Sequence, residues 1–272
     1  MKRKTTSSSW EEVSKEYGKS VADKGHYYHR NVILPRLLKL LDFKNPQEQV
    51  DKRNISDFLL DLGCGQGVLS RAIPQKIGYL GLDVSPSLIR EAELKNRNKN
   101  HSFSIKDLSV ATTTEHSKNP MAFSHAVALL SLQNMEYPDR AINYGVSLLK
   151  EGGVFIAVLN HPCFRIPRLS SWSVDEKQQS VYRRVDRYLT KTSIPIVMNP
   201  GKKNSVSTIS FHFPLSYWTQ VFSEAGLLIK CMEEWISDKT SIGSKSKAEN
   251  KARKEIPLFL AIKAYKISCL RK

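Results

Sequence analysis

Short apolar runs alternate with segments of helical periodicity along the first 160 residues of the chain. Apolar runs of this length are typical of buried strands, and apolar positions three and four residues apart are typical of helices. Strands that alternate with helices form parallel βαβ units, so this half of the chain predicts an open, twisted α/β sheet. The apolar runs span 58–62, 77–84, 101–105, 124–130 and 153–160, and helices are expected at 66–75, 86–98 and 138–149.

The segments on both sides of this alternation predict a helical cover and a lid. Residues 9–43 have apolar positions near helical spacing, and a polar loop at 44–54 follows them. The stretch 161–204 is polar, aromatic and basic, has no clear period, and is too long for an ordinary connection, which indicates a functional insertion. Beyond it we expect a strand at 205–213, a helix at 214–226 that ends at Gly226, and an antiparallel pair of strands at 227–235 and 258–267.

Length and composition are those of a globular protein with one domain. The chain has 272 residues, of which 40% are hydrophobic and 25% charged. No apolar run approaches the roughly 20 residues of a membrane span, and the basic N-terminus lacks the apolar region of a secretory signal. Four cysteines without a C-x-x-C pair favour reduced thiols and a cytoplasmic location. The expected division of residues 1–272 is a helical cover at about 9–54, a cofactor-binding core at 55–160, a lid at 161–204 and a sheet edge at 205–268.

The net charge of +16 raises the question of a nucleic-acid partner. Nine of these charges lie in two ends and one polar stretch, since residues 2–4 contribute +3, residues 244–254 contribute +4 and residues 271–272 contribute +2. Basic edges of this kind can contact RNA or acidic membranes, but they are more often simply solvated. A small molecule is therefore the expected partner, and RNA is the alternative.

A glycine-rich turn follows the first apolar run, in the sequence Asp61-Leu62-Gly63-Cys64-Gly65-Gln66-Gly67. A strand-to-helix turn presents bare backbone N–H groups to a ligand, and glycines let the ligand approach the backbone closely. The spacing is not that of a phosphate-binding P-loop, since the chain contains no Gly-Lys-Ser/Thr. It is not the dinucleotide fingerprint either, since the third glycine is Gly67 and position 68 is valine.

This D-x-G-x-G-x-G pattern resembles the S-adenosylmethionine (SAM) binding loop of class I, Rossmann-like methyltransferases, and the order of elements resembles their fold. The resemblance implies a seven-stranded, mostly parallel sheet with an antiparallel last strand. It also implies SAM as the cofactor, with S-adenosylhomocysteine (SAH) as its product. In that family the glycine loop, here Gly63, Cys64, Gly65 and Gly67, packs against SAM, and the acid that matches Asp61 holds the methionyl part.

Further positions of the family pattern have matching residues. An acid at the end of the second strand accepts hydrogen bonds from the ribose hydroxyls, and Asp83, followed by Val84, lies 20 residues after Gly63. An acid after the third strand binds the adenine amino group, and Asp107 matches it. The resemblance implies further cofactor contacts from the backbone of Leu108, which follows Asp107. It also implies contacts from Leu130 and Ser131 after the fourth strand, and from Tyr28 in the N-terminal helices.

Methyl transfer from a sulfonium needs a base only when the acceptor must lose a proton. His161 follows the fifth apolar run, at the sheet edge where open α/β proteins bind ligands, so it is a candidate base or substrate contact; the alternative is a turn histidine. Cys163 does not match the RNA cytosine-C5 methyltransferases, because their second cysteine after the fourth strand is absent. The [DN]-P-P-[YF] loop of many base-methylating enzymes is absent too.

Candidate substrate contacts come from the N-terminal cover, the loop after the fourth strand and the lid. Arginine and aromatic side chains in the lid suit an aromatic or carboxylate-bearing substrate, although they could also stack on RNA bases or form a charged face. The candidates are Tyr27, His29, Gln133, Asn134, Arg184, Tyr188 and His212.

These features together predict a SAM-dependent methyltransferase that acts on an O or C atom of a small, aromatic or acidic metabolite. Within class I, the resemblance is to the small-molecule methyltransferases that include the ubiquinone and menaquinone enzymes. RNA methylation and SAM binding without catalysis are the alternatives. No metal site is expected, because no His, Asp or Glu cluster has ligand spacing.

Overall fold

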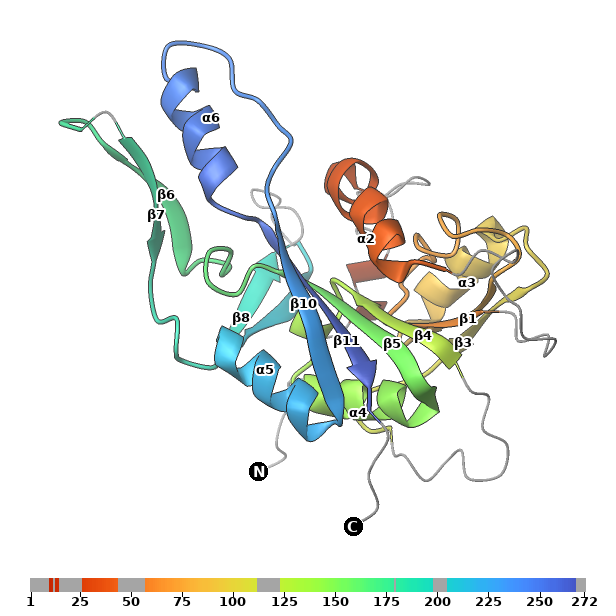
Figure 1. Cartoon of the computed structure of the whole chain (residues 1–272). Coiled ribbons are helices and arrows are strands. Elements are labelled where there is room, and N and C mark those ends of the chain that lie inside the picture. The colour runs from red at the N-terminus through yellow and green to blue at the C-terminus, as the bar shows by residue number, and fades with distance from the viewer. Residues whose placement is uncertain are drawn as a thin grey trace.

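The computed structural model describes residues 10, 11, 13, 14, 26–43, 57–111, 123–178, 180–197 and 205–267 (Figure 1). A seven-stranded sheet forms its centre, in the order β10-β11-β5-β4-β1-β2-β3. Five of the strands are parallel, and β11 pairs antiparallel with both β5 and β10, as the sequence predicts. These strands are β1 (Phe58–Leu62), β2 (Gly78–Asp83), β3 (His101–Ile105), β4 (Phe123–Leu129), β5 (Leu149–Asn160), β10 (Leu227–Trp235) and β11 (Phe259–Lys266).

Helices begin and end where the local sequence favours it. The Ser85 hydroxyl accepts a hydrogen bond from the N–H of Leu88 (3.2 Å) and so caps the helix that begins at Pro86. Gly226, with φ +76°, ends the helix that precedes it. The helices are η1 (His29–Ile33), α2 (Leu34–Leu41), α3 (Pro86–Lys95), η4 (Leu132–Asn134), α4 (Pro138–Leu148), α5 (Leu215–Glu224) and α6 (Ser246–Glu255). The expected loop at 44–54, the cover at 15–25 and the basic ends lie outside the described residues.

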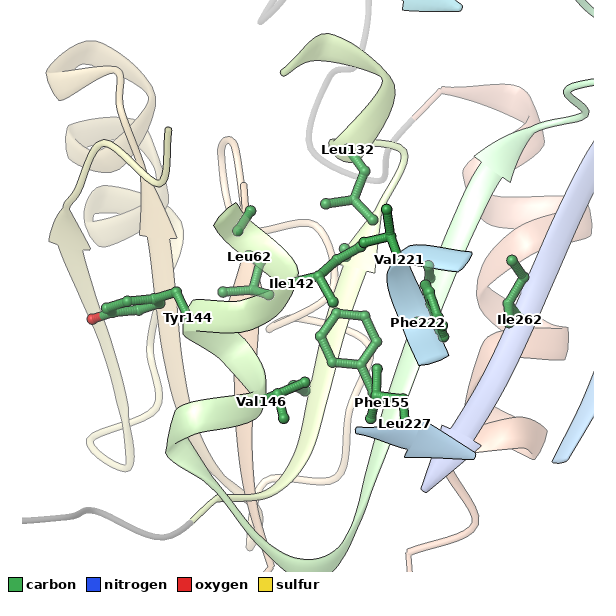
Figure 2. Packing of buried hydrophobic residues seen from close by; sticks show 14 of the residues in the cluster. Leu62, Leu132, Ile142, Tyr144, Val146, Phe155, Val221, Phe222, Leu227 and Ile262 are labelled. Atoms are coloured by element: carbon green, nitrogen blue, oxygen red, sulfur yellow. The ribbon is translucent and has the colours of Figure 1, made fainter. Parts of the chain in front are cut away.

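Helices cover both faces of the sheet, because its central strands are apolar on both sides. Alternate residues of β5 belong to two separate cores: Phe155 packs with α4 and α5, and Ile156 packs with α2 and η1. Figure 2 shows the first of these cores, where Phe155, Ile142 of α4 and Phe222 of α5 point toward one another. A rigid, doubly covered sheet of this kind holds the loops at its carboxyl edge in fixed positions.

Truncating Phe222 should destabilise this core strongly. The side chain is fully buried, and its ring meets that of Phe155 edge-on with centroids 5.5 Å apart. We expect Phe222→Ala to lower the free energy of unfolding by about 3–5 kcal/mol, as measured by urea denaturation. Leu94→Ala on α3, where the side chain is 78% exposed, is the control and should change stability by less than about 0.5 kcal/mol. Equal effects of the two variants would contradict the packing described here.

The expected helix at 66–75 is wrong, since this segment forms a series of turns. The N–H of Gly67 donates to Cys64 O (3.0 Å) and that of Ala72 to Leu69 O (2.9 Å), each three residues back. Gly65 and Gly67 have φ of +54° and +71°, in the left-handed region that an α-helix cannot accommodate. The glycines that shape the ligand turn therefore prevent a regular helix from starting there.

The lid stretch 161–204 contains strands that the sequence did not predict. β6 (Ser170–Asp175) and β7 (Ser180–Val185) form a hairpin, and β8 (Thr192–Val197) pairs antiparallel with β9 (Ser207–His212). The strand expected at 205–213 therefore belongs to this second small sheet and not to the edge of the main one. β6 and β7 have no buried face, so their sequence has no hydrophobic period to detect.

Helix α6 occupies the polar stretch at 244–254, for which no helix was expected. Among its residues only Ala252 is buried, so the helix has no apolar stripe. Glu249 and Arg253 form an i,i+4 ion pair (3.8 Å) along it. In Figure 1 it lies beside the β6–β7 hairpin, at the end of the molecule away from α3, and it contacts β7.

Candidate functional site

The carboxyl ends of β1, β2, β4 and β5 form one edge of the sheet, and the candidate site lies along it. The chain passes from β1 outward to β2 and β3 on one side, and returns to β4 and β5 on the other. Open α/β sheets bind ligands at the carboxyl edge where the strand order reverses in this way. Within the residues that the structure describes, no helix is long and apolar enough to cross a membrane.

The glycine turn is fixed to the sheet by its own backbone. The N–H groups of Gly63 and Cys64 both donate to Leu82 O of β2, at 2.8 and 2.9 Å. The three glycines have φ of +77°, +54° and +71°, and side chains rarely adopt this conformation. The side chain of Ser131 lies against the turn, because a Cβ atom on Gly63 would fall 2.5 Å from Ser131 Cβ. The turn is therefore shaped by residues on β1, β2 and the end of β4 together.

Asp61 has a buried carboxyl group with one oxygen left without a partner. Its Oδ2 accepts a hydrogen bond from the Tyr79 hydroxyl (2.6 Å), while Oδ1 has no hydrogen-bond partner among the described residues. Burial raises the pKa of Asp61 to about 7, the hydrogen bond from Tyr79 lowers it, and the nearby Asp83 raises it further. A buried acceptor of this kind is costly unless a ligand supplies a donor.

Asp83 ends β2 and is held by two backbone donors. Its Oδ2 accepts from the N–H of Gly65 (2.9 Å) and its Oδ1 from the N–H of Ser85 (3.0 Å). Burial raises its pKa, and these backbone donors lower it. Glu11 lies next to it, where its carboxylate accepts hydrogen bonds from Ser85 Oγ (2.5 Å) and Ser87 N–H (3.2 Å). A carboxylate has about four acceptor positions, so Asp83 can still accept a hydrogen bond from a ligand hydroxyl.

A cavity beside the glycine turn, called here the β1 cavity, is lined by Asp61 and by the turn itself, whereas Asp83 lies outside its lining. It contains about 340 Å³ of empty space that includes open solvent. His29 from η1 faces it, and its Nδ1 is a second buried atom without a partner among the described residues. Burial lowers the pKa of His29 to about 4, so its ring is neutral near pH 7. The cavity is lined by His29, Asp61, Gly63, Cys64, Gly65, Gln66, Val68, Leu69 and Leu129.

The other predicted cofactor residues lie around the same edge. Asp107 accepts from the N–H and the hydroxyl of Ser109, at 2.9 and 2.6 Å, and Leu108 beside it is buried. Leu130 has φ +52°, and Ser131 Oγ donates to Leu62 O (2.5 Å). Val84 is 43% exposed at the end of β2.

A second cavity, called here the β5 cavity, lies over the ends of β4 and β5. Its wall combines aromatic rings with polar side chains, and it contains about 320 Å³ of empty space that includes open solvent. β9 contacts η4 and brings His212 beside Gln133, and Ser210 Oγ donates to Gln133 O (3.3 Å). The cavity is lined by Gln133, Leu159, Asn160, Pro162, Arg165, Pro167, Ser210, Phe211, His212, Phe213 and Trp218.

His161 is buried at the end of β5, and both of its ring nitrogens have partners. Nε2 lies 2.7 Å from Glu234 Oε1, and Nδ1 accepts from the N–H of Cys163 (3.2 Å). Burial lowers the pKa of His161, and the bond to Glu234 raises it. The Glu234 side chain is 58% exposed. Nε2 therefore carries the ring proton and donates it to Glu234, and the ring can take up a further proton only at Nδ1, after the Cys163 N–H releases it.

The remaining predicted substrate residues occupy different places. The Tyr27 hydroxyl donates a hydrogen bond to Asp238 Oδ2 (3.0 Å), and the Tyr28 hydroxyl is hydrogen-bonded to Ser237 Oγ (3.2 Å), both in the segment after β10. Tyr28 does not line the β1 cavity, whereas His29 does. Tyr188 lies next to His212, whose Nε2 is 2.7 Å from Tyr188 O. Asn134 Nδ2 donates to Leu130 O (3.1 Å). Arg184 is exposed on β7, outside both cavities.

Comparisons with known proteins agree with this geometry. Residues 60–155 match a protein family described as "Methyltransferase domain", and this segment holds Asp61, the glycine turn and Asp83. A SAM-dependent methyltransferase structure from Mesorhizobium loti is 21% identical, with a TM-score of 0.59, over 77% of this chain and 91% of that one. One from Listeria monocytogenes is 21% identical, with a TM-score of 0.61, over 86% and 98%.

A third similar structure contains a partner. It is a Haloferax volcanii complex of a methyltransferase with the Trm112 methyltransferase activator, and the matching chain is 14% identical with a TM-score of 0.61, over 96% of this chain and 99% of that one. No curated protein matches the chain. At these levels of identity the solved structures show that the chain has the class I methyltransferase fold.

Proposed function

We propose that the chain, which is a SAM-dependent methyltransferase with SAM as its cofactor, methylates an O or C atom of a small, aromatic or acidic metabolite. The observation that carries this proposal is the pair of cavities at one sheet edge, where Leu129 of β4 lines the first and Gln133 just after β4 lines the second. SAM supplies an electrophilic methyl group on a sulfonium. The chain's own residues bind SAM and the substrate, orient them, and exclude water from the site.

The β1 cavity fits the methionyl end of SAM. Asp61 Oδ1 is a buried acceptor that lacks a donor, and an ammonium group supplies both the hydrogen bond and the opposite charge. We assign the neighbouring Asp83 and Val84 to the ribose, and Asp107 with the backbone of Leu108 to the adenine. Leu130 and Ser131 complete the cofactor contacts together with the glycine turn.

The β5 cavity fits a compact substrate with an apolar body and polar substituents. Phe211, Phe213 and Trp218 provide the apolar wall, while Gln133 and His212 provide polar contacts. Its mixed aromatic and polar lining suits a small aromatic or acidic metabolite. Catalysis in this arrangement comes mainly from holding the acceptor atom in line with the methyl group.

His161 is our candidate for a base where the acceptor must lose a proton. It precedes Pro162 of the β5 cavity, and its Nε2 contacts the carboxylate of Glu234. Because Nδ1 accepts the N–H of Cys163, Nε2 carries the ring proton and donates it to Glu234, so Nδ1 is the nitrogen that takes up a proton once the Cys163 N–H releases it. A carboxylate beside the ring also stabilises the imidazolium that forms after proton transfer.

Asp83→Ala should weaken the binding of SAH, measured by calorimetry, by about 10- to 100-fold, because the two ribose hydrogen bonds to a charged acceptor contribute about 1.5–3 kcal/mol. Asp175→Ala is the matched control, since Asp175 also accepts from two backbone N–H groups (both 3.0 Å), but in the β6–β7 turn. The control should leave SAH affinity unchanged. Wild-type affinity in Asp83→Ala would contradict the assignment of Asp83 to the ribose.

The function is tested with methyl-labelled SAM, the purified protein, and a cell extract separated into metabolite, RNA and protein fractions. Label in the metabolite fraction supports the proposal and allows mass spectrometry to identify the product. The net charge of +16 favours RNA as the second candidate acceptor. Label in RNA alone would replace the small-molecule proposal, and no label in any fraction would favour a SAM-binding protein without turnover.

A further inference from the structure

The β5 cavity contains a buried arginine that has no acidic partner. Arg165 follows β5 in a tight turn, where its N–H donates to His161 O (2.8 Å), and its side chain lines the cavity. Its Nη1 is buried without a hydrogen-bond partner among the described residues. The titratable groups that act on it are Tyr28, which is a neutral phenol near pH 7, the like-charged Arg183, and His26, and no carboxylate of the described chain is among them.

Aromatic rings hold this guanidinium in place without neutralising it. Its Cζ lies 4.8 Å from the ring centroid of Phe259 and 6.0 Å from that of Tyr28. Burial lowers the pKa of Arg165, but an arginine stays charged at any physiological pH. A buried cation without a counter-charge is unfavourable, and it becomes favourable when an anion binds to it.

The neighbouring arginine is different, because its donors are already used. Arg183 donates to Phe164 O (2.6 Å) and to Ser170 Oγ (2.7 Å), and its guanidinium lies 5.3 Å from the Trp172 ring centroid. Arg183 therefore supports the lid structure, while Arg165 lines the β5 cavity and has a buried Nη1 without a partner among the described residues. One guanidinium matches one negative charge, and its planar fork matches the two oxygens of a carboxylate.

We propose that the β5 cavity binds a small organic carboxylate, with the carboxylate on Arg165 and the apolar body against Phe211, Phe213 and Trp218. This proposal rests on the function proposed above and commits it to an acidic substrate. Gln133 Oε1, also buried without a partner in the described chain, accepts a hydrogen bond from a donor on the same molecule, such as a hydroxyl. A carboxylate held by Arg165 is not the methyl acceptor, so the product keeps its negative charge.

The first test measures binding to the SAH-saturated enzyme by calorimetry and thermal shift. Benzoate is the probe, benzamide is its uncharged counterpart, and inorganic phosphate tests for a different anion. We expect benzoate to bind at least about tenfold more tightly than benzamide and phosphate. Arg165→Gln should lose this preference, and Arg184→Gln, the same charge change on the exposed face of β7, should retain it. Equal binding of benzoate and benzamide, stronger binding of phosphate, or a wild-type preference in Arg165→Gln would overturn the proposal.

Thermal unfolding of the ligand-free variants separates ligand binding from a structural role. If Arg165 serves to bind an anion, Arg165→Gln removes an unpaired buried charge and should unfold at the wild-type temperature or higher. A large drop in unfolding temperature, with the benzoate preference unchanged, would assign Arg165 to packing alone and overturn the proposal.

The second test uses methyl-labelled SAM with the metabolite fraction, followed by anion exchange at pH 7. We expect the labelled product to be retained, and its yield to fall at least about tenfold in Arg165→Gln but not in Arg184→Gln. Label only in uncharged products, including base-labile methyl esters, would overturn the carboxylate proposal while the methyltransferase function stands. Benzoate binding that depends on Arg165, with no metabolite labelled, would leave the carboxylate site in place and contradict the proposed function.

Discussion

Gly63→Ala should weaken SAH binding on the order of 100-fold while leaving the enzyme folded. A non-glycine residue at φ +77° costs about 1–2 kcal/mol. The added Cβ would also lie 2.5 Å from Ser131 Cβ, so Ser131 must move and lose its hydrogen bond to Leu62 O, at about 1 kcal/mol. Holding the turn in its binding shape then costs roughly 2–3 kcal/mol in total. Calorimetry with SAH measures the loss, and circular dichroism verifies the fold.

Gly152→Ala is the matched control for this prediction. Gly152 has nearly the same conformation (φ +70°), but nothing lies within 4 Å of the position of an added Cβ atom. It lies in β5, outside the glycine turn. It should reduce stability by about 1 kcal/mol and leave SAH affinity unchanged. If both variants bind SAH equally well, the close contact between Gly63 and Ser131 is not part of the binding site.

The strands of the main sheet could be predicted from the sequence because burial on both faces leaves a clear signal. The run at 58–62 is β1 (Phe58–Leu62), and the run at 124–130 matches β4 (Phe123–Leu129); nearly every residue of both strands is buried. The lid strands gave no such signal. In β7 the residues alternate between exposed and half-buried, and its structure depends on pairing with β6, which no local pattern records.

The position of the proposed cofactor residues at the carboxyl edge of the sheet could also be predicted, because these residues follow strand ends in a fixed order. The substrate side could not, because packing between distant segments creates it. Arg165 was missed, because its burial depends on Phe259 of β11 and Tyr28 of the cover, which lie 94 and 137 residues away in sequence. The sequence assigned Tyr28 to the cofactor and His29 to the substrate, but His29 lines the β1 cavity and Tyr28 lines neither cavity, since the helical turn at η1 decides which side chain faces it.

Lowering the pH below 7 should release SAH, because Asp61 must be charged to hold an ammonium group. Burial raises the pKa of this carboxyl to about 7, whereas an α-amino group stays protonated to about pH 8. Below pH 7, binding must first remove a proton from Asp61, so affinity should fall about tenfold per pH unit and about 100-fold by pH 5. His29 has a pKa of about 4 and stays neutral over this range. Calorimetry with SAH between pH 5 and 8 measures the slope.

Tyr79→Phe and Asp61→Asn identify the group that causes this slope. The Tyr79 hydroxyl lowers the pKa of Asp61, so Tyr79→Phe should move the midpoint of the affinity profile to higher pH. Asp61→Asn should bind SAH weakly at every pH and show a much smaller slope. A wild-type slope in Asp61→Asn would assign the titration to another group, with Asp83 as the first to test, since burial raises its pKa as well.

The stability of the ligand-free enzyme should change in the opposite direction. In the folded chain Asp61 has a pKa of about 7, well above the value of about 4 in an unfolded chain. The folded state therefore binds the proton more tightly, and stability falls as pH rises from about 4 to 7. Asp61→Asn should remove that loss and raise the free energy of unfolding at pH 8 by roughly 2–4 kcal/mol. A variant that is more stable yet binds SAH more weakly is expected only if this carboxylate is kept buried for its ligand.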